Sequence, residues 1–180
     1  MPKYVAFLRA VNVGGHIVKM DQLRRLFKSQ GFTNVETFIA SGNVIFDSPV
    51  RSTQKLEKKI EQNLKKNLGY EVETFIRSIA ELAEIASYEP FPGGESDGEG
   101  CVVYIGFLGN SPAAAARKKL LLLRTPVDEF HLNGREFYWL CRGRMSDSQI
   151  TGNLLQKTLG MQTTMRNSNT VRRLVTKYPG

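Results

Sequence analysis

The order of β-prone and helix-like runs is the feature that most constrains the fold of this chain. In residues 3–77, four short β-prone runs alternate with two stripes of apolar residues at helical spacing. The β-prone runs are residues 3–9, 35–40, 43–46 and 71–77. The helical stripes are Met20, Leu23, Leu26 and Phe27, and then Leu56, Ile60 and Leu64, with Gly31 and Gly69 where C-terminal caps belong. The order β-α-β-β-α-β predicts a ferredoxin-like unit.

The same order of elements returns after residue 100. The β-prone runs are residues 101–107, 129–132, 135–141 and 162–165, and helices are predicted after Ser111-Pro112, over 148–160 and over 169–178. Asn133-Gly134 is the strongest two-residue hairpin signal in the chain. The predicted fold class is therefore α+β, with two ferredoxin-like (βαββαβ) units in tandem and mostly antiparallel sheets.

The boundary between the two predicted units is marked by a change in composition. Residues 89–100, EPFPGGESDGEG, are rich in proline, glycine and acid, which is typical of a flexible linker or loop. Ser78 and Glu81 form a capping-box pattern just before it, which predicts a connecting helix. We therefore expect a first unit with its connecting helix at 1–88, a linker at 89–100, and a second unit with a C-terminal helix at 101–180.

Composition excludes several classes of protein. The hydrophobic content of 41% is enough for a packed core, and no apolar run approaches the length of a membrane span. The N-terminus lacks a signal-peptide pattern, so a soluble, cytoplasmic protein without a membrane partner is expected. Cys101, Cys141, His16 and His131 have no metal-ligand spacing, so we expect reduced thiols, no metal site and no cofactor. The sequence carries no signal for an oligomeric state.

The net charge of +8 is concentrated in the second half of the chain. Residues 101–180 hold 12 basic and 4 acidic residues. This balance favours an anionic partner, either a small molecule or a nucleic acid, although exposed lysine and arginine are also ordinary surface residues. The aromatic strand at 135–143 lacks the sequence signature of an RNA-recognition motif, so the nucleic-acid interpretation has weak support.

Strand order brings two polar segments together. In a ferredoxin-like sheet of spatial order 4-1-3-2, the end of strand 1 at Arg9–Asn12 lies beside the start of strand 3 at Ser41–Asn43. Glycines let a turn present backbone N–H groups, and a following helix favours anions. The sequence thus predicts a ligand-binding corner, although each segment alone is equally compatible with ordinary turn chemistry. Its candidate residues are Arg9, Asn12, Gly14, Gly15, His16, Ser41, Gly42 and Asn43.

A third polar group follows the last predicted strand. Thr164, Arg166 and Asn167 are candidate ligand-binding residues, because a guanidinium suits carboxylate or phosphate groups. The same segment is also typical of a helix cap, with Asn167 or Ser168 starting the terminal helix. Whether it joins the corner depends on how the units pack.

Signals for catalysis are sparse. Ser41 and His16 are predicted to approach one another, but no oriented carboxylate accompanies them, and His131 on a short strand is typical of a structural histidine. No catalytic residue is assigned.

Four segments together resemble a known family. LRAVNVGG, MDQLRRLF, VETFIASGNVIFDS and TTMRNSNTVRRL resemble, in order, the bacterial domain of unknown function 1697 family. The resemblance implies a bacterial protein with the two-unit α+β arrangement, and it implies no activity. Two residues depart from the pattern: Ala10 stands where the family has glycine, and Ser168 stands where it has tryptophan.

These observations favour binding of an anionic, phosphate-bearing small ligand at the corner of converging loops. A nucleic-acid-binding module that uses the basic second unit, an enzyme at the same corner, and a protein–protein adaptor remain as alternatives.

Overall fold

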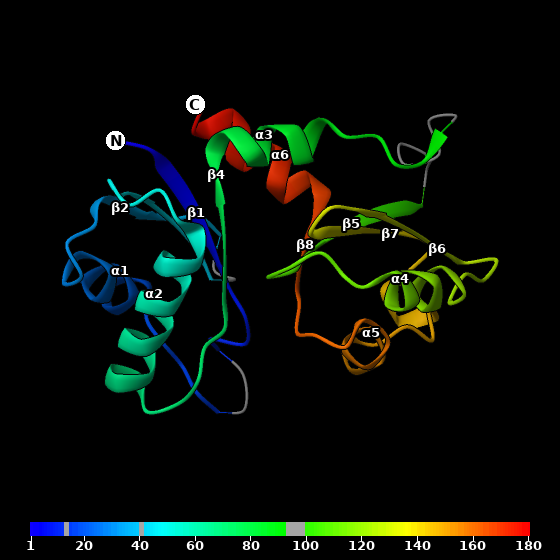
Figure 1. The fold of residues 1–180 in the computed structure, drawn as a ribbon, viewed down its shortest axis with the longest axis horizontal. Helices are drawn as coiled ribbons and strands as arrows, with labels where there is room; N and C mark the ends of the chain where they lie inside the picture. Colours follow the sequence, from blue (N-terminus) through cyan, green and yellow to red (C-terminus); the bar gives the residue numbers. More distant parts are fainter. Residues whose placement is uncertain (13–14, 40–41, 93–99) are drawn as a thin grey trace. The chain divides into compact units, whose positions relative to one another are not determined.

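The computed structural model describes residues 1–12, 15–39, 42–92 and 100–180 (Figure 1). These residues form two compact units. The first unit consists of Met1–Ala83 with Leu174–Gly180, and the second of Glu84–Arg173. Most of the expected linker at 89–100 lies outside the described residues. Among the described residues, no helix is both long enough and apolar enough to span a bilayer.

The first unit is a four-stranded antiparallel sheet covered by two helices. Its spatial strand order is β2-β3-β1-β4, as predicted for a ferredoxin-like unit. Its elements are β1 (Lys3–Leu8), α1 (Met20–Lys28), β2 (Thr33–Thr37), β3 (Asn43–Asp47), α2 (Thr53–Leu68) and β4 (Thr74–Ser78).

The second unit repeats this topology. Its strand order is β6-β7-β5-β8, again with antiparallel neighbours, which confirms the predicted fold class. Its elements are β5 (Cys101–Phe107), α4 (Ala114–Leu121), β6 (Asp128–Asn133), β7 (Glu136–Arg142), a short 3₁₀ helix (Met145–Asp147), α5 (Gly152–Leu159) and β8 (Thr164–Asn167). The chain passes between the units within two helices, α3 (Ile79–Ser87) and α6 (Ser168–Lys177).

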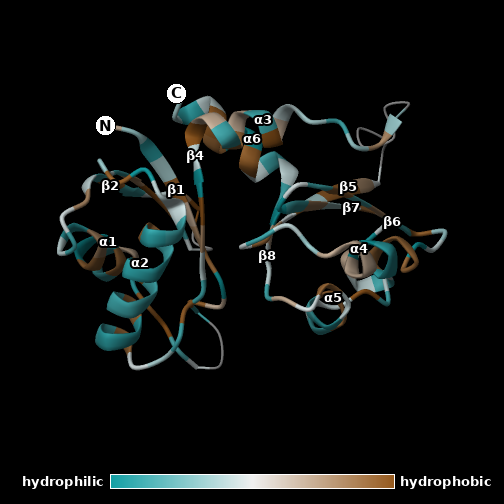
Figure 2. Ribbon diagram, viewed as in Figure 1, coloured by the Kyte–Doolittle hydropathy of each residue, from teal (hydrophilic) through white to brown (hydrophobic). Residues whose placement is uncertain are grey.

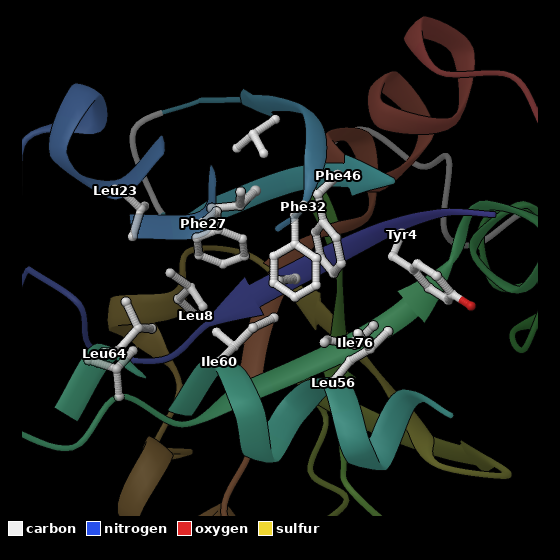
Figure 3. Packing of buried hydrophobic residues seen from close by; sticks show 14 of the residues in the cluster. Tyr4, Leu8, Leu23, Phe27, Phe32, Phe46, Leu56, Ile60, Leu64 and Ile76 are labelled. Carbon is white, nitrogen blue, oxygen red and sulfur yellow. The ribbon is translucent and has the colours of Figure 1, made fainter. Parts of the chain in front are cut away.

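The core of the first unit lies between one sheet face and the two helices. Tyr4, Ala6 and Leu8 alternate along β1 toward this core, as the two-residue period of a strand requires. α2 is mostly hydrophilic, and its buried residues form one stripe (Figure 2). The packed side chains from β1, α1 and α2 include Leu8, Leu23, Phe27, Leu56, Ile60 and Leu64 (Figure 3). Burying a side chain of this size contributes roughly 1.5–3 kcal/mol to stability.

Two glutamates of α2 close the outer edge of β4. The backbone N–H groups of Thr74 and Ile76 donate to Glu61 Oε1 at 3.1 Å and to Glu57 Oε1 at 3.0 Å. Unpaired edge N–H groups invite association with another chain, so these carboxylates protect the edge. Burial raises the pKa of Glu61, which the bond from Thr74 opposes.

Predicted element boundaries are wrong at the two hairpins. β2 ends at Thr37 rather than at residue 40, because Ile39 has a φ of 56°, which a strand cannot contain. In the second unit Asn133 still pairs with Glu136, so the turn residues are Gly134 and Arg135 rather than Asn133 and Gly134. Gly134 has the positive φ, 64°, that a tight hairpin turn needs at its first central position.

Other boundaries shift by a few residues. The last strand is residues 164–167 rather than 162–165, because its pairing with β5 begins at Thr164 and Phe107. α5 begins at Gly152, since the Thr151 hydroxyl accepts from the Leu154 N–H and caps the helix there. The predicted C-terminal cap Gly69 is confirmed as a left-handed residue, whereas the C-cap of α1 is Ser29 rather than Gly31. Gly160 caps α5 in the left-handed conformation.

Candidate functional site

The end of β1 and the start of β3 meet in the first unit. Leu8 N–H donates to Gly42 O at 2.9 Å, and Phe7 pairs with Asn43 in the sheet register. The predicted convergence of these two strand ends is therefore confirmed for the described residues. Gly14 and Ser41, two of the candidate ligand-binding residues, lie outside the described residues.

Gly42 allows the two strand ends to approach closely. Its φ is 79°, and a Cβ on it would lie 3.1 Å from Val11 Cγ1 and 3.2 Å from Leu8 Cβ. Asn43 beside it is 1% exposed, and its Nδ2 donates to Phe38 O at 2.9 Å. Gly42 and Asn43 therefore shape the hairpin that forms one wall of the corner.

The loop between β1 and α1 forms the other wall. Asn12 Oδ1 accepts from the Val18 N–H at 2.8 Å, which closes the loop on itself. His16 is exposed and stacks on the ring of Tyr70, with 3.9 Å between ring centroids. Tyr70 OH in turn donates to Val11 O at 2.8 Å. Tyr70 thus contacts the loop at both Val11 and His16. No sequence pattern predicts the contact with Val11, because the two residues are 59 positions apart.

The Arg9 guanidinium lies next to an acidic side chain just before β4, the strand on the side of β1 away from β3. Its Nη1 lies 3.7 Å from Glu73 Oε1, and both side chains are 30% exposed. Burial raises the pKa of Glu73, while the nearby Arg9 guanidinium lowers it. A partly exposed ion pair of this kind contributes little to stability.

A cavity beside Glu73 has the wrong charge for an anion. Its volume is about 270 Å³, and its polar side chains are three carboxylates, one amide and one ammonium group. The lining residues are Glu61, Gln62, Lys65, Glu71, Val72 and Glu73. The lining of this cavity is therefore unsuited to an anion.

Ala10 occupies a strained position between Arg9 and the loop. Its φ is 55°, in the left-handed region, and its side chain is exposed. The family resemblance placed a glycine here, and the backbone shows the physical reason, because only glycine adopts this conformation without a Cβ penalty.

We expect Ala10→Gly to raise the free energy of unfolding by about 1 kcal/mol, since it removes the left-handed strain. Ala115→Gly is the matched control, because Ala115 is an exposed residue with helical backbone in α4 and its replacement should lower stability by about 0.5–1 kcal/mol. Urea denaturation measures both. If both variants lose the same free energy of unfolding, then the backbone of Ala10 is not strained.

The third polar group, Thr164, Arg166 and Asn167, lies on β8 of the second unit, and its side chains form hydrogen bonds within that unit. Arg166 is buried, and its Nη1 donates to Thr164 Oγ1 and to Met165 O, each at 2.8 Å. Burial lowers the pKa of Arg166 to about 10, so the guanidinium stays charged at neutral pH. Asn167 Oδ1 accepts from the Asn169 N–H at 2.9 Å and so supports the start of α6.

The first unit holds an arginine in the equivalent register position. Arg77 on β4 pairs with Val5 of β1, as Arg166 on β8 pairs with Ile105 of β5. Arg77 Nη1 donates to the carbonyl of the preceding residue, Ile76, at 2.9 Å, as Arg166 does to that of Met165. The repeated contact indicates that these arginines support the sheets.

His131 has a structural partner. Its Nε2 lies 2.7 Å from Tyr88 OH, and burial, followed by the charge of Arg117, lowers the pKa of the imidazole. The described residues contain no group of three or more His, Cys, Asp or Glu side chains that could hold a metal ion. Cys101 and Cys141 are both free; Cys141 pairs with Val102, so the two thiols lie on opposite faces of the sheet.

The fold defines an α+β protein built from two ferredoxin-like units. The family model described as "Protein of unknown function (DUF1697)" matches residues 1–138, and the chain belongs to that family. Among solved structures, it is similar to the conserved bacterial protein SP0830 from Streptococcus pneumoniae, with 19% identity, 98% of each chain covered and a TM-score of 0.78. This similarity concerns the fold alone. No curated protein matches the chain.

Proposed function

We propose that this protein binds a small anionic ligand, of the phosphate-ester class, at the corner between β1 and β3. The observation that carries the proposal is the hydrogen bond from Leu8 N–H to Gly42 O at 2.9 Å, because it brings the loop after β1 against the hairpin before β3. The described residues of the corner are Arg9, Asn12, Gly15 and His16 with Gly42 and Asn43. Gly14 and Ser41, which the sequence also assigns to it, lie outside the described residues.

The described residues of the corner supply the chemistry that an anion needs. Arg9 provides a half-exposed guanidinium, and His16 an exposed imidazole held by Tyr70. Gly15 is exposed with a φ of 83°, so its backbone can present an N–H where other residues would be strained. A phosphate ester matches this set of donors, since guanidinium and backbone N–H groups bind its oxygens in parallel.

Thermal-shift and calorimetric titrations of the full chain test the proposal. The probes are inorganic phosphate, nucleoside monophosphates and sugar phosphates. We expect at least one phosphate ester to raise the melting temperature, and we expect Arg9→Gln to weaken its binding about tenfold, the loss of one charge-assisted contact.

Arg51→Gln is the control, because Arg51 is an exposed arginine of the same unit that lies outside the corner. This variant should bind the phosphate ester with the wild-type affinity. Arg9→Lys should recover part of the affinity. The proposal fails if no probe binds the wild type, or if Arg9→Gln and Arg51→Gln bind equally well.

The nucleic-acid alternative receives little support from the aromatic strand β7. RNA-binding sheets stack bases on exposed aromatic side chains. Phe137, Tyr138 and Trp139 are each at most 2% exposed. The phosphate ester therefore stays the proposed ligand.

A further inference from the structure

The exposed side of α2 in the first unit consists of lysines and neutral amides (Figure 2). The structure describes this helix throughout, and its exposed residues are Gln54, Lys55, Lys58, Lys59, Gln62, Lys65, Lys66 and Asn67. Successive residues of a helix are about 100° apart, so the five lysines fall within about 120° of its circumference, opposite the buried stripe. These five lysines form the lysine face.

The glutamates of the same helix are turned toward the sheet. Glu61 precedes Lys65 by four residues, a spacing typical of an ion pair on a helix surface. In the structure, however, Glu61 and Glu57 are partly buried, and their Oε1 atoms accept from the N–H groups of Thr74 and Ile76 on β4. The carboxylates that the sequence places beside the lysines therefore serve the edge of the sheet.

Most of the positive charge of the lysine face has no acidic partner. Lys65 pairs with Glu71 at 3.2 Å, but both side chains are highly exposed, so the pair is weak. Lys59 Nζ donates to the neutral carbonyl of Gln30 at 2.8 Å, which leaves its charge uncompensated. The other three lysines form no ion pair within the described part of the chain; they are Lys55, Lys58 and Lys66.

A row of cations of this length suits the phosphate backbone of a nucleic acid. Between Lys55 and Lys66 the helix rises about 16 Å, at about 1.5 Å per residue. A DNA duplex carries one phosphate for about every 1.7 Å of its axis, so several phosphates lie within that length. Lysine binds phosphate as a point charge on a flexible stem and does not need to reach the bases.

An anionic lipid surface would also attract lysines, but it matches this face less well. Helices that bind at a membrane surface add apolar side chains that enter the lipid. The apolar stripe of α2 is buried in the core of the first unit. The large exposed apolar side chains of the described residues lie outside α1 and α2; they are Met1, Ile17, Ile39, Val50, Tyr88, Leu121, Leu122 and Met145. A nucleic acid needs only ionic contacts, which this face supplies.

We propose that the lysine face of α2 binds the sugar–phosphate backbone of a nucleic-acid duplex without sequence preference. The ammonium groups of Lys55, Lys58 and Lys66 contact phosphates and release the counterions bound to them. The surface shares no residue with the corner between β1 and β3 and does not rest on the function proposed there. It also differs from the basic second unit, because α2 belongs to the first unit.

Fluorescence anisotropy of the full chain with labelled DNA and RNA duplexes of about 20 base pairs, which are longer than α2, tests the proposal. We expect duplexes of two unrelated sequences to bind equally well, since backbone contacts carry no sequence information. We also expect the logarithm of the affinity to fall linearly with the logarithm of the salt concentration, with a slope of about −3 to −5 for three to five phosphate contacts.

A triple variant locates the binding on α2. Lys55→Gln/Lys58→Gln/Lys66→Gln should weaken duplex binding about tenfold or more and make the salt slope shallower by about 2 to 3, the loss of three phosphate contacts. Glutamine has nearly the helix propensity of lysine, so the helix should be retained, with circular dichroism as the check. If the triple variant does not fold, Lys58→Gln alone should make the slope shallower by about 1.

The matched control is Lys118→Gln/Lys119→Gln/Lys157→Gln, which removes the same charge from exposed positions on α4 and α5 of the second unit. It should bind duplexes like the wild type. Equal losses in the two triple variants would overturn the proposal, because binding would then follow the net charge of the chain rather than the lysine face.

Four other outcomes would overturn the proposal. They are no duplex binding at about 50 mM salt, a preference for one of the two sequences, tighter binding to vesicles of phosphatidylserine and phosphatidylcholine than to duplexes, and loss of duplex binding in Arg9→Gln. The last result would place the duplex at the corner of the first unit. Failure of phosphate esters to bind at that corner leaves this test unaffected.

Discussion

Gly106→Ala should lower the free energy of unfolding of the second unit by roughly 3 kcal/mol or more, one of the largest effects of any single methyl group in this chain. A Cβ at residue 106 would lie 2.0 Å from Phe137 Cε1 and 2.1 Å from Phe137 Cζ. Phe137 is fully buried in the core under α4 and α5, so its ring has no free space to enter. Urea denaturation followed by circular dichroism measures the loss.

The first unit shows why the clash is specific. Ala6 holds the corresponding place on β1, where it pairs with Val44, whereas Gly106 on β5 pairs with Phe137. A larger partner on one strand is compensated by a smaller residue on the other, as close packing requires. The double variant Gly106→Ala/Phe137→Leu should therefore be more stable than expected from the sum of its single changes.

Gly109→Ala is the matched control for this prediction. Gly109 follows the same strand, and a Cβ there would have no heavy atom within 4 Å. Its replacement should change stability by less than about 0.5 kcal/mol. If Gly106→Ala is as well tolerated as Gly109→Ala, then the packing around Phe137 differs from that described.

Asp128→Ala should destabilise the second unit by about 3–5 kcal/mol, because this one buried carboxylate accepts hydrogen bonds from side chains of three separate segments. Asp128 is 1% exposed. Its Oδ1 accepts from Trp139 Nε1 at 2.9 Å and from Ser148 Oγ at 2.7 Å, and its Oδ2 accepts from Thr125 Oγ1 at 2.9 Å. Removal of the carboxylate leaves the Trp139 indole N–H buried without its acceptor.

Two further variants calibrate the Asp128 prediction. Asp128→Asn should lower the free energy of unfolding less than Asp128→Ala does, since the single amide oxygen can still accept hydrogen bonds from part of the network. Glu71→Ala removes an exposed carboxylate that pairs with Lys65 at 3.2 Å, and it should cost less than about 1 kcal/mol. Chemical denaturation of all three is the measurement, and a cost for Asp128→Ala no larger than that for Glu71→Ala would refute the network.

Local patterns were sufficient to predict the fold class and the strand order. Strand alternation, the apolar stripe of α2 and the glycine caps are properties of neighbouring residues, and the ferredoxin-like order then follows from the sequence of elements. The boundaries at Ile39 and Asn133 were mispredicted, because turn conformation depends on how the two strands of a hairpin pair, which composition alone does not specify.

The candidate site was predictable in part. Topology alone brought the end of β1 to the start of β3, and the contact between Leu8 and Gly42 agrees with it. The supports from Tyr70 and Glu73 were not predictable, because these residues lie about 60 positions away in the chain and belong to no recognisable motif. The same holds for Asp128, whose partners come from a turn, a strand and a loop.

By itself, the sequence determined that this chain forms two βαββαβ units and which strand ends lie next to each other, since both depend on short-range periodicity and on the limited number of ways to order four strands. Only the tertiary structure decided which polar side chains are exposed and which are used internally. Asn43 and Arg166 have the composition of ligand-binding residues, yet they bind backbone carbonyls of their own unit, whereas the five lysines of α2 lie together on its exposed face. The reason is that burial and hydrogen-bond partners depend on residues far apart in the chain, which become neighbours only when the sheets and helices pack.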